Sequence, residues 1–225
     1  MIMSKSAKVV SRVTASGSPT TAATAILDVA EQLAQTRGYN GFSYADIAVQ
    51  LGVTKASLHY HFPSKAHLGS ALIDRYQQSF DAALDLIDCQ TQVPAEKLHR
   101  YVDLYEAVLL NDRMCLCGML AAEYATLPTP MQEGLISFFD ANERWLTKAL
   151  QAGVQVGVFV LAESANARAR VLLGALEGAM LVARSYGDSN RFRSAAAFLL
   201  ADLGHGSQRS RPKPAMAVPR SRSQS

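Results

Sequence analysis

Residues 42–65 of the chain read FSYADIAVQLGVTKASLHYHFPSK. Ser43, followed three residues later by Asp46, has the form of a capping box, in which a serine side chain and an acid satisfy free backbone donors at a helix start. Gly52 interrupts the helical pattern, and Thr54 is a good N-cap for a second helix that Pro63 would end. The stretch therefore predicts two short helices, over 44–51 and over 55 to about 62, joined by a tight turn.

Three residues of this stretch fit the packing of a helix-turn-helix motif. The motif needs a small residue where its helices cross, a glycine in the turn and an apolar anchor under the second helix. Ala48, Gly52 and Leu58 occupy those positions. Leu58 would face the first helix while its neighbours face outward.

Helical periodicity continues on both sides of the motif. Before it, apolar residues from Ala23 to Ala34 recur at helical spacing, and Arg37-Gly38 supplies an end signal for a helix over 20–37. The 35 alanines favour helix over strand. We expect an all-α fold of about nine helices, with an N-terminal helix-turn-helix head and a larger helical body. The further helices are predicted over 64–88, 94–111, 118–126, 131–152, 163–186 and 190–203, with a loop at 153–161.

Composition excludes several classes of protein. With 225 residues, 49% hydrophobic and 18% charged, the chain suits a soluble globular protein. The longest apolar stretch without a charge, residues 149–162, is shorter than the ~18 residues needed to span a bilayer. Three cysteines are an odd number for a disulfide framework, and the first residues lack the leucine-rich core of a signal peptide. We therefore expect a cytoplasmic protein without membrane contact.

Charge divides the chain into tails and a folded part. Eight of the 22 basic residues and no acid lie in residues 1–19 and 204–225, which leaves 14 bases against all 19 acids between them. We predict a disordered basic arm at 1–19, the helix-turn-helix head at 20–66, the larger helical body at 67–203, and a disordered basic tail at 204–225. The tails either contact nucleic acid through charge or act as solvated ends that aid solubility.

Taken as a whole, residues 42–65 resemble the DNA-binding head of the TetR family of transcriptional repressors. The resemblance covers about residues 20–70 by motif, and the order and lengths of the later helices are similar to that family's body. It implies a homodimer that binds a palindromic operator in double-stranded DNA and releases it when a small-molecule inducer enters the body. An activator of the same family is the alternative.

The resemblance also implies which residues meet the bases of the operator. The helix from Lys55 would enter the major groove. Lys55, Ser57 and Tyr60 would then contact bases or backbone.

Phosphate contacts are implied at the helix starts. Ser43, Tyr44 and Thr54 would hold phosphates with hydroxyls and backbone amides, and Lys65 would do so from the start of the connecting helix. The family most often has tyrosine where this chain has His59. An imidazole would replace the phenol there, and would bind phosphate more strongly when protonated.

One stripe of the 163–186 helix is typical of a helix–helix interface. Gly174 and Gly178, four residues apart, leave a shallow face that another helix can approach closely. The resemblance implies a four-helix dimer interface there, and packing within one chain is the alternative. The interface residues expected are Val171, Gly174, Ala175, Gly178, Val182, Phe192, Ala196 and Leu199.

A ligand pocket is expected among the apolar and aromatic side chains of the body. Glu177 lies in an apolar run and needs a partner or a polar cavity if buried, so it is either a salt-bridged structural residue or a ligand contact. The other candidates are equally compatible with plain core packing. They are Tyr101, Tyr105, Met119, Tyr124, Phe139, Trp145 and Met180.

Cys115 and Cys117 lie two residues apart, near Arg113 and just before a predicted helix start, where backbone amides and a cation would lower a thiol pKa. This region is similar to a subgroup of the family that responds to electrophiles through a cysteine near this point. The two thiols are therefore candidate oxidant or electrophile sensors. The alternative is that both are small buried hydrophobes.

Two competing classes are weaker. A di-iron enzyme needs a Glu-x-x-His pair on each of two helices, and Glu96 to His99 is the single such pair. A helical protein-interaction module is the other class, and an operator-binding assay would distinguish it from a DNA-binding regulator. No catalytic motif occurs in the sequence, so we expect no enzyme, no metal and no other cofactor.

Overall fold

The computed structural model describes residues 21–204, which are all-helical. This range contains the nine α-helices expected from the sequence, and the predicted arm and nearly all of the predicted tail lie outside it. The helices are α1 Thr21–Arg37, α2 Tyr44–Leu51, α3 Lys55–His61, α4 Lys65–Gln90, α5 Pro94–Leu109, α6 Leu116–Ala122, α7 Thr129–Gln155, α8 Ala165–Ser185 and α9 Ser189–Gly204, with a 3-10 turn, η1, at Tyr124–Thr126.

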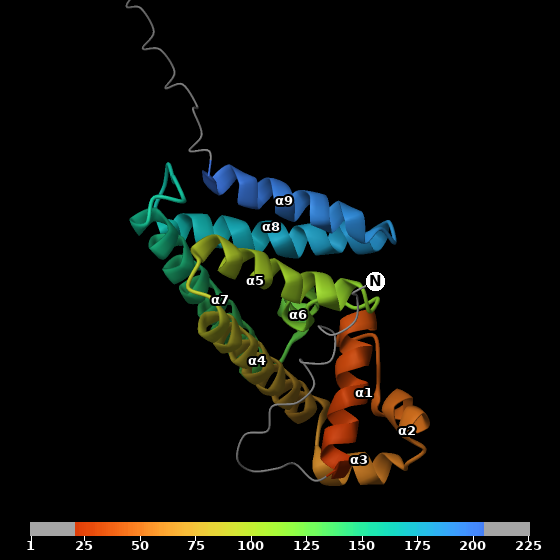
Figure 1. Cartoon of the computed structure of the whole chain (residues 1–225). Coiled ribbons are helices and arrows are strands. Elements are labelled where there is room, and N and C mark those ends of the chain that lie inside the picture. Colours follow the sequence, from red (N-terminus) through yellow and green to blue (C-terminus); the bar gives the residue numbers. More distant parts are fainter. Residues whose placement is uncertain (1–20, 205–225) are drawn as a thin grey trace, which may run out of the picture.

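The helices form a small head and a larger body (Figure 1). Helices α1, α2 and α3 make the head, and α4 leads from it into the body. Helices α8 and α9 lie side by side at the end of the molecule away from α3. Among the described helices, none has the length and apolarity needed to cross a membrane.

The core of the body is built from aromatic rings on α4, α5 and α7. The ring of Phe80 lies 5.3 Å from that of Phe138 and 6.0 Å from those of Tyr101 and Tyr105. Trp145 stacks on Tyr101 with the ring centroids 5.5 Å apart. Such contacts between close-packed rings stabilise the core beyond the burial of their surface.

Two predicted helices end at other residues than expected, and packing explains the second case. The helix expected over 118–126 begins at Leu116 and ends at Ala122, and Tyr124–Thr126 forms the separate turn η1. The loop expected from Gly153 begins later, because Gly153 is part of α7. A Cβ on Gly153 would lie 1.9 Å from the ring of Phe159, so the glycine permits that ring to fold back onto the helix rather than ending it.

The body holds the head by hydrogen bonds to the C-terminal end of α1. From α8, Arg184 donates to the backbone oxygens of Gln35 at 2.9 Å and Thr36 at 2.6 Å. At the end of α6, the carboxylate of Glu123 accepts from the amides of Tyr39 at 2.5 Å and Asn40 at 3.1 Å. A helix C-terminus leaves carbonyls without intrahelical partners, and an arginine satisfies two of them at once. We call these contacts the head–body joint.

Candidate nucleic-acid interface

The start of α2 is fixed by the predicted capping box, which the structure confirms. The Ser43 side chain accepts from the amide of Ala45 at 3.2 Å, and Asp46 accepts from the Ser43 amide at 2.7 Å. The Ser43 hydroxyl also lies 2.7 Å from Asp46. These hydrogen bonds lower the pKa of Asp46. The amide and hydroxyl of Ser43 are thus already used within the chain, which limits what they can give to a phosphate.

Helix α3 is anchored by one residue and capped by another. Leu58 is fully buried beneath it, and the Thr54 side chain accepts from the amide of Ser57 at 3.3 Å. Gly52 has φ +67, so the predicted glycine turn is left-handed as expected. Tyr60 stands on the outer face with 85% of its surface exposed. Helix α3 therefore presents a polar face while its apolar face fixes its position.

Tyr44 lies at the start of α2 and also has a structural role within the head. Its hydroxyl donates to the backbone oxygen of Phe62 at 2.7 Å, and its buried ring lies 4.7 Å from that of His59. Burial raises the pKa of Tyr44 to about 12. Because the phenol proton is engaged by a carbonyl, its backbone amide remains the group of Tyr44 that can meet a phosphate.

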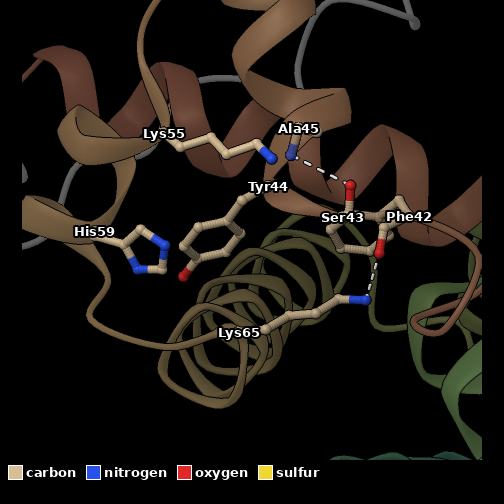
Figure 2. A pocket seen from close by; sticks show the side chains of 7 residues that line it. All are labelled: Phe42, Ser43, Tyr44, Ala45, Lys55, His59 and Lys65. Carbon is tan, nitrogen blue, oxygen red and sulfur yellow. Dashed lines mark hydrogen bonds between the residues drawn. The ribbon is translucent and has the colours of Figure 1, made fainter.

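A hollow of about 320 Å³ opens between α2, α3 and the start of α4. In Figure 2 the ring of His59 lies beside that of Tyr44, with Lys55 and Lys65 on opposite sides of Tyr44 in the view. Two ammonium groups and an imidazole in one hollow favour an anion the size of a phosphate. The hollow is lined by Phe42, Ser43, Tyr44, Ala45, Lys55, His59 and Lys65.

Lys65 reaches across the hollow to the loop between α1 and α2. Its ammonium donates to the backbone oxygens of Tyr39, at 2.5 Å, and of Phe42, and lies 4.4 Å from the centre of the Phe42 ring. Burial lowers the pKa of Lys65, and the carboxylates of Glu123 and Asp46 partly offset this. Two of its three donors are therefore committed to the fold, and the predicted phosphate contact rests on the third.

The body contains a buried acid, Glu177 on α8. Neither of its oxygens has a hydrogen-bond partner of good geometry in the described part of the chain. Burial raises the pKa of Glu177 to about 7, although Cys115 and Tyr105 lie close enough to favour the charged form. Gly118 makes room for the carboxyl, since a Cβ there would lie 2.2 Å from Glu177 Oε2. Of the two predicted roles, the salt-bridged one is wrong.

The remaining ligand candidates separate into three groups. Tyr101, Tyr105 and Met180 are buried, and the Tyr101 hydroxyl donates to Asn142 Oδ1 at 2.8 Å. Trp145 and Phe139 are partly buried against the same core. Met119 also packs against this core, with its sulfur 3.8 Å from Arg184 at the head–body joint, whereas Tyr124 is 41% exposed in η1. Because α6 ends at Ala122, Tyr124 lies in a separate turn, and its contact with a ligand stays a prediction.

The environment of the two central thiols is opposite to the one predicted. Cys115 and Cys117 are buried at the start of α6. Burial, followed by the Glu177 carboxylate, raises the pKa of both thiols well above the ordinary value. Cys115 Sγ acts as the N-cap and accepts from the amide of Gly118 at 3.5 Å. The expected lowering of the thiol pKa is therefore wrong, because desolvation outweighs the helix-start amides.

The residues predicted for the dimer interface are mostly exposed on α8 and mostly buried on α9. Val171 and Val182 are exposed, and a Cβ on Gly174 or Gly178 would meet nothing within 4 Å. Phe192 and Ala196 are instead buried within the chain, so their assignment to an exposed face is wrong. Ala175 and Leu199 are partly buried.

The outward apolar side chains that the sequence reasoning missed are Leu181 and Phe198, the latter 75% exposed. Leu181 lies three residues after Gly178, so the same helical stripe contained the signal. On α9, Phe192, Ala196 and Leu203 form the buried face, and Phe198 lies off it. The contacts of the head–body joint were missed as well, and their long sequence separations left no local pattern to find.

Comparisons with known proteins agree with this geometry. A family model described as "Bacterial regulatory proteins, tetR family" matches residues 26–72. The solved structure of a TetR-family transcriptional regulator from Agrobacterium tumefaciens is 33% identical, with a TM-score of 0.80 over 83% of this chain and 100% of that one. The transcriptional regulator AcuR of Cereibacter sphaeroides is 26% identical over 66% of this chain and 69% of its own. The HTH-type transcriptional repressor DhaR of Mycobacterium sp. (strain GP1) is 22% identical over 69% of this chain and 79% of its own.

Proposed function

Because the chain belongs to the TetR family of transcriptional regulators, we propose that it is a repressor that binds a two-fold-symmetric operator as a homodimer and leaves it when an inducer binds the body. Members of this family are DNA-binding regulators and not enzymes. The repressor role is supported by the name of the relative DhaR.

The observation that carries the proposal is the surface of the head. Lys55, His59 and Tyr60 are exposed on α3, Leu58 fixes that helix from below, and Lys55 and His59 border the cationic hollow beside α2. A helix presented in this way fits the major groove, while the hollow suits a phosphate of the flanking backbone. We assign base contacts to Lys55, Ser57 and Tyr60, and phosphate contacts to the amides near Ser43, Tyr44 and Thr54, to Lys65 and to His59.

The homodimer is supported by the apolar face that α8 and α9 leave exposed. Val171, Leu181, Val182 and Phe198 are all exposed there. The open glycines of α8 allow a second helix to approach closely. A two-fold interface at this end would hold two heads at the spacing of operator half-sites, about 10 bp or one helical turn apart.

The inducer site is proposed around Glu177. A buried carboxyl without a good hydrogen-bond partner is costly, and a ligand that donates a hydrogen bond would relieve that cost. Tyr101, Tyr105 and Met180 are the neighbouring core residues that such a ligand would meet or displace. The alternative inducer is an electrophile that reacts with Cys115 or Cys117. That reaction requires α6 to open, because both thiols are buried. Release of bound DNA by an added small molecule tests this part.

The experiment for the whole proposal is selection of a duplex from a random-sequence pool, followed by titration and footprinting. We expect one dimer to protect two related half-sites. Tyr60→Ala should weaken binding to that duplex by about 1–3 kcal/mol, as expected for the loss of a base contact. Tyr124→Ala, which removes an exposed tyrosine from η1 in the body, is the control and should bind like wild type. A monomer that enriches no sequence would refute the proposal.

A further inference from the structure

His59 is held in one orientation by the backbone. Its Nδ1 lies 3.2 Å from the backbone oxygen of Pro63. A carbonyl oxygen can accept but not donate, so this contact places a proton on Nδ1. In the neutral imidazole the other nitrogen, Nε2, then carries a lone pair and no proton.

Two cationic side chains share the hollow with His59. Lys55 on α3 and Lys65 at the start of α4 line the same hollow, and the ammonium of Lys65 is turned toward the backbone oxygens of Tyr39 and Phe42. From α2, Tyr44 packs against the ring, and burial keeps its phenol neutral by raising its pKa to about 12.

The other charged and titratable groups nearby have their own partners. Asp46 on α2 accepts from Ser43 and lies 3.9 Å from Arg37. His67 on α4 is paired with the Ser64 hydroxyl at 2.7 Å. Within the described residues, no carboxylate lines the hollow with His59. The side chains that line the hollow are therefore cationic or neutral, and the carboxylates of Glu123 and Asp46 act on Lys65 from outside it.

A phosphate oxygen in the hollow favours the protonated form of the ring. It repels the lone pair of a neutral Nε2, whereas it accepts a charge-assisted hydrogen bond from a protonated Nε2. Its negative charge also compensates the two lysines. From this geometry we infer that His59 binds a DNA phosphate as the imidazolium, so that each protomer takes up one proton when it binds DNA. This inference rests on the proposed function, because it concerns the same DNA interface.

The consequence is a pH-dependent affinity. Histidine changes its charge between about pH 5 and 8. Wherever binding DNA adds one proton per protomer, the dissociation constant of the wild-type complex should rise about tenfold per protomer for each unit of pH, and less at pH values where His59 is already protonated in the free protein. The ionic strength must be held constant, because phosphate contacts are also sensitive to salt.

The test uses the full chain and the duplex selected from the random pool, with a scrambled duplex of the same composition as a second probe. Anisotropy titrations across this pH range give the slope of log Kd. Calorimetry in buffers of different ionisation enthalpy counts the protons of the wild-type complex directly. His59→Gln and His59→Tyr both keep a polar group that does not titrate in this range, and both should lower the proton count by about one per protomer on either duplex.

His99→Gln is the matched control, since His99 is an exposed histidine on α5 in the body. It should keep the wild-type slope. Wild-type protein that binds DNA with no proton uptake, or His59 variants that keep the wild-type proton count, would overturn the inference and leave the proposed function intact. Failure to bind either duplex at any pH would overturn both.

Discussion

Two carboxylates of this chain lie in opposite environments, and they mark the difference between its head and its body. Asp46 in the head accepts hydrogen bonds from the amide and hydroxyl of Ser43, which lower its pKa. Glu177 in the body is buried without a good hydrogen-bond partner, and its pKa is raised to about 7. The acid of the head is satisfied by a residue three positions before it, whereas the carboxyl of the body has Cys115 and Tyr105 close by and no hydrogen-bond partner of good geometry.

The difference between Asp46 and Glu177 distinguishes polar groups that hold the fold together from polar groups that are candidates for binding a ligand. At the start of α2 in the head, satisfied polar groups build the scaffold, and the exposed side chains of α3 remain available to an external ligand. In the body, the unsatisfied group is itself the candidate site, because burying it without a partner costs stability that core packing must offset. The head–body joint lies between the two regions and is fully hydrogen-bonded at Arg184 and Glu123.

The largest effect should come from the body. Unfolded Glu177 ionises near 4.5 and the folded residue near 7, so the native state binds one more proton between these values and the free energy of unfolding falls as the pH rises. The loss should reach about 3 kcal/mol by about pH 8. Glu177→Gln should remove this loss, measured by urea denaturation at about pH 5 and pH 8.

Glu133→Gln, which neutralises an exposed glutamate on α7, is the control and should keep the wild-type pH dependence. If Glu177→Gln lost as much stability as wild type over this range, the buried acid would not be protonated in the folded protein. The contrast with Asp46 would then disappear.

A smaller effect is expected at the head–body joint. Arg184→Met would leave the backbone oxygens of Gln35 and Thr36 without their donor and should cost about 2 kcal/mol of unfolding free energy. Hydrogen exchange should accelerate more in α1 to α3 than in α7 to α9, because the joint attaches the head to the body. Arg170→Met, on the same helix but pairing with Glu143 at the surface, should cost at most about 0.5 kcal/mol. Uniform acceleration throughout the chain would show that Arg184 does not act on the head in particular.

The head was predictable because its determinants are local. The capping box of Ser43 and Asp46, the left-handed Gly52, the cap Thr54 and the anchor Leu58 lie within 16 positions of one another, and each acts on backbone close to it. Local hydrogen-bonding chemistry and helical periodicity were sufficient to place them.

The rest depended on contacts between residues far apart in sequence. No local pattern shows that the amine of Lys65 turns to the carbonyls of Tyr39 and Phe42, 26 and 23 residues away. The face of α9 was assigned wrongly because Phe192 and Phe198 are both apolar, and packing against neighbouring helices decides which is buried. The site around Glu177 was found in part, since a lone acid in an apolar run stands out in sequence.

The smallest effect on stability, and the sharpest test of the body, is expected in the reaction rates of the three thiols. Cys89 is exposed at the end of α4, whereas Cys115 and Cys117 are buried beside Glu177. A thiol reacts as the thiolate, and burial raises the pKa of both Cys115 and Cys117. A disulfide reagent such as dithiodipyridine should therefore modify one thiol per protomer quickly, and the other two at least about tenfold more slowly. Cys89→Ser should abolish the fast phase, and the three thiols should react alike in urea. A fast phase of two thiols in folded Cys89→Ser protein would show instead that α6 opens readily, which is the condition for sensing an electrophile at these positions.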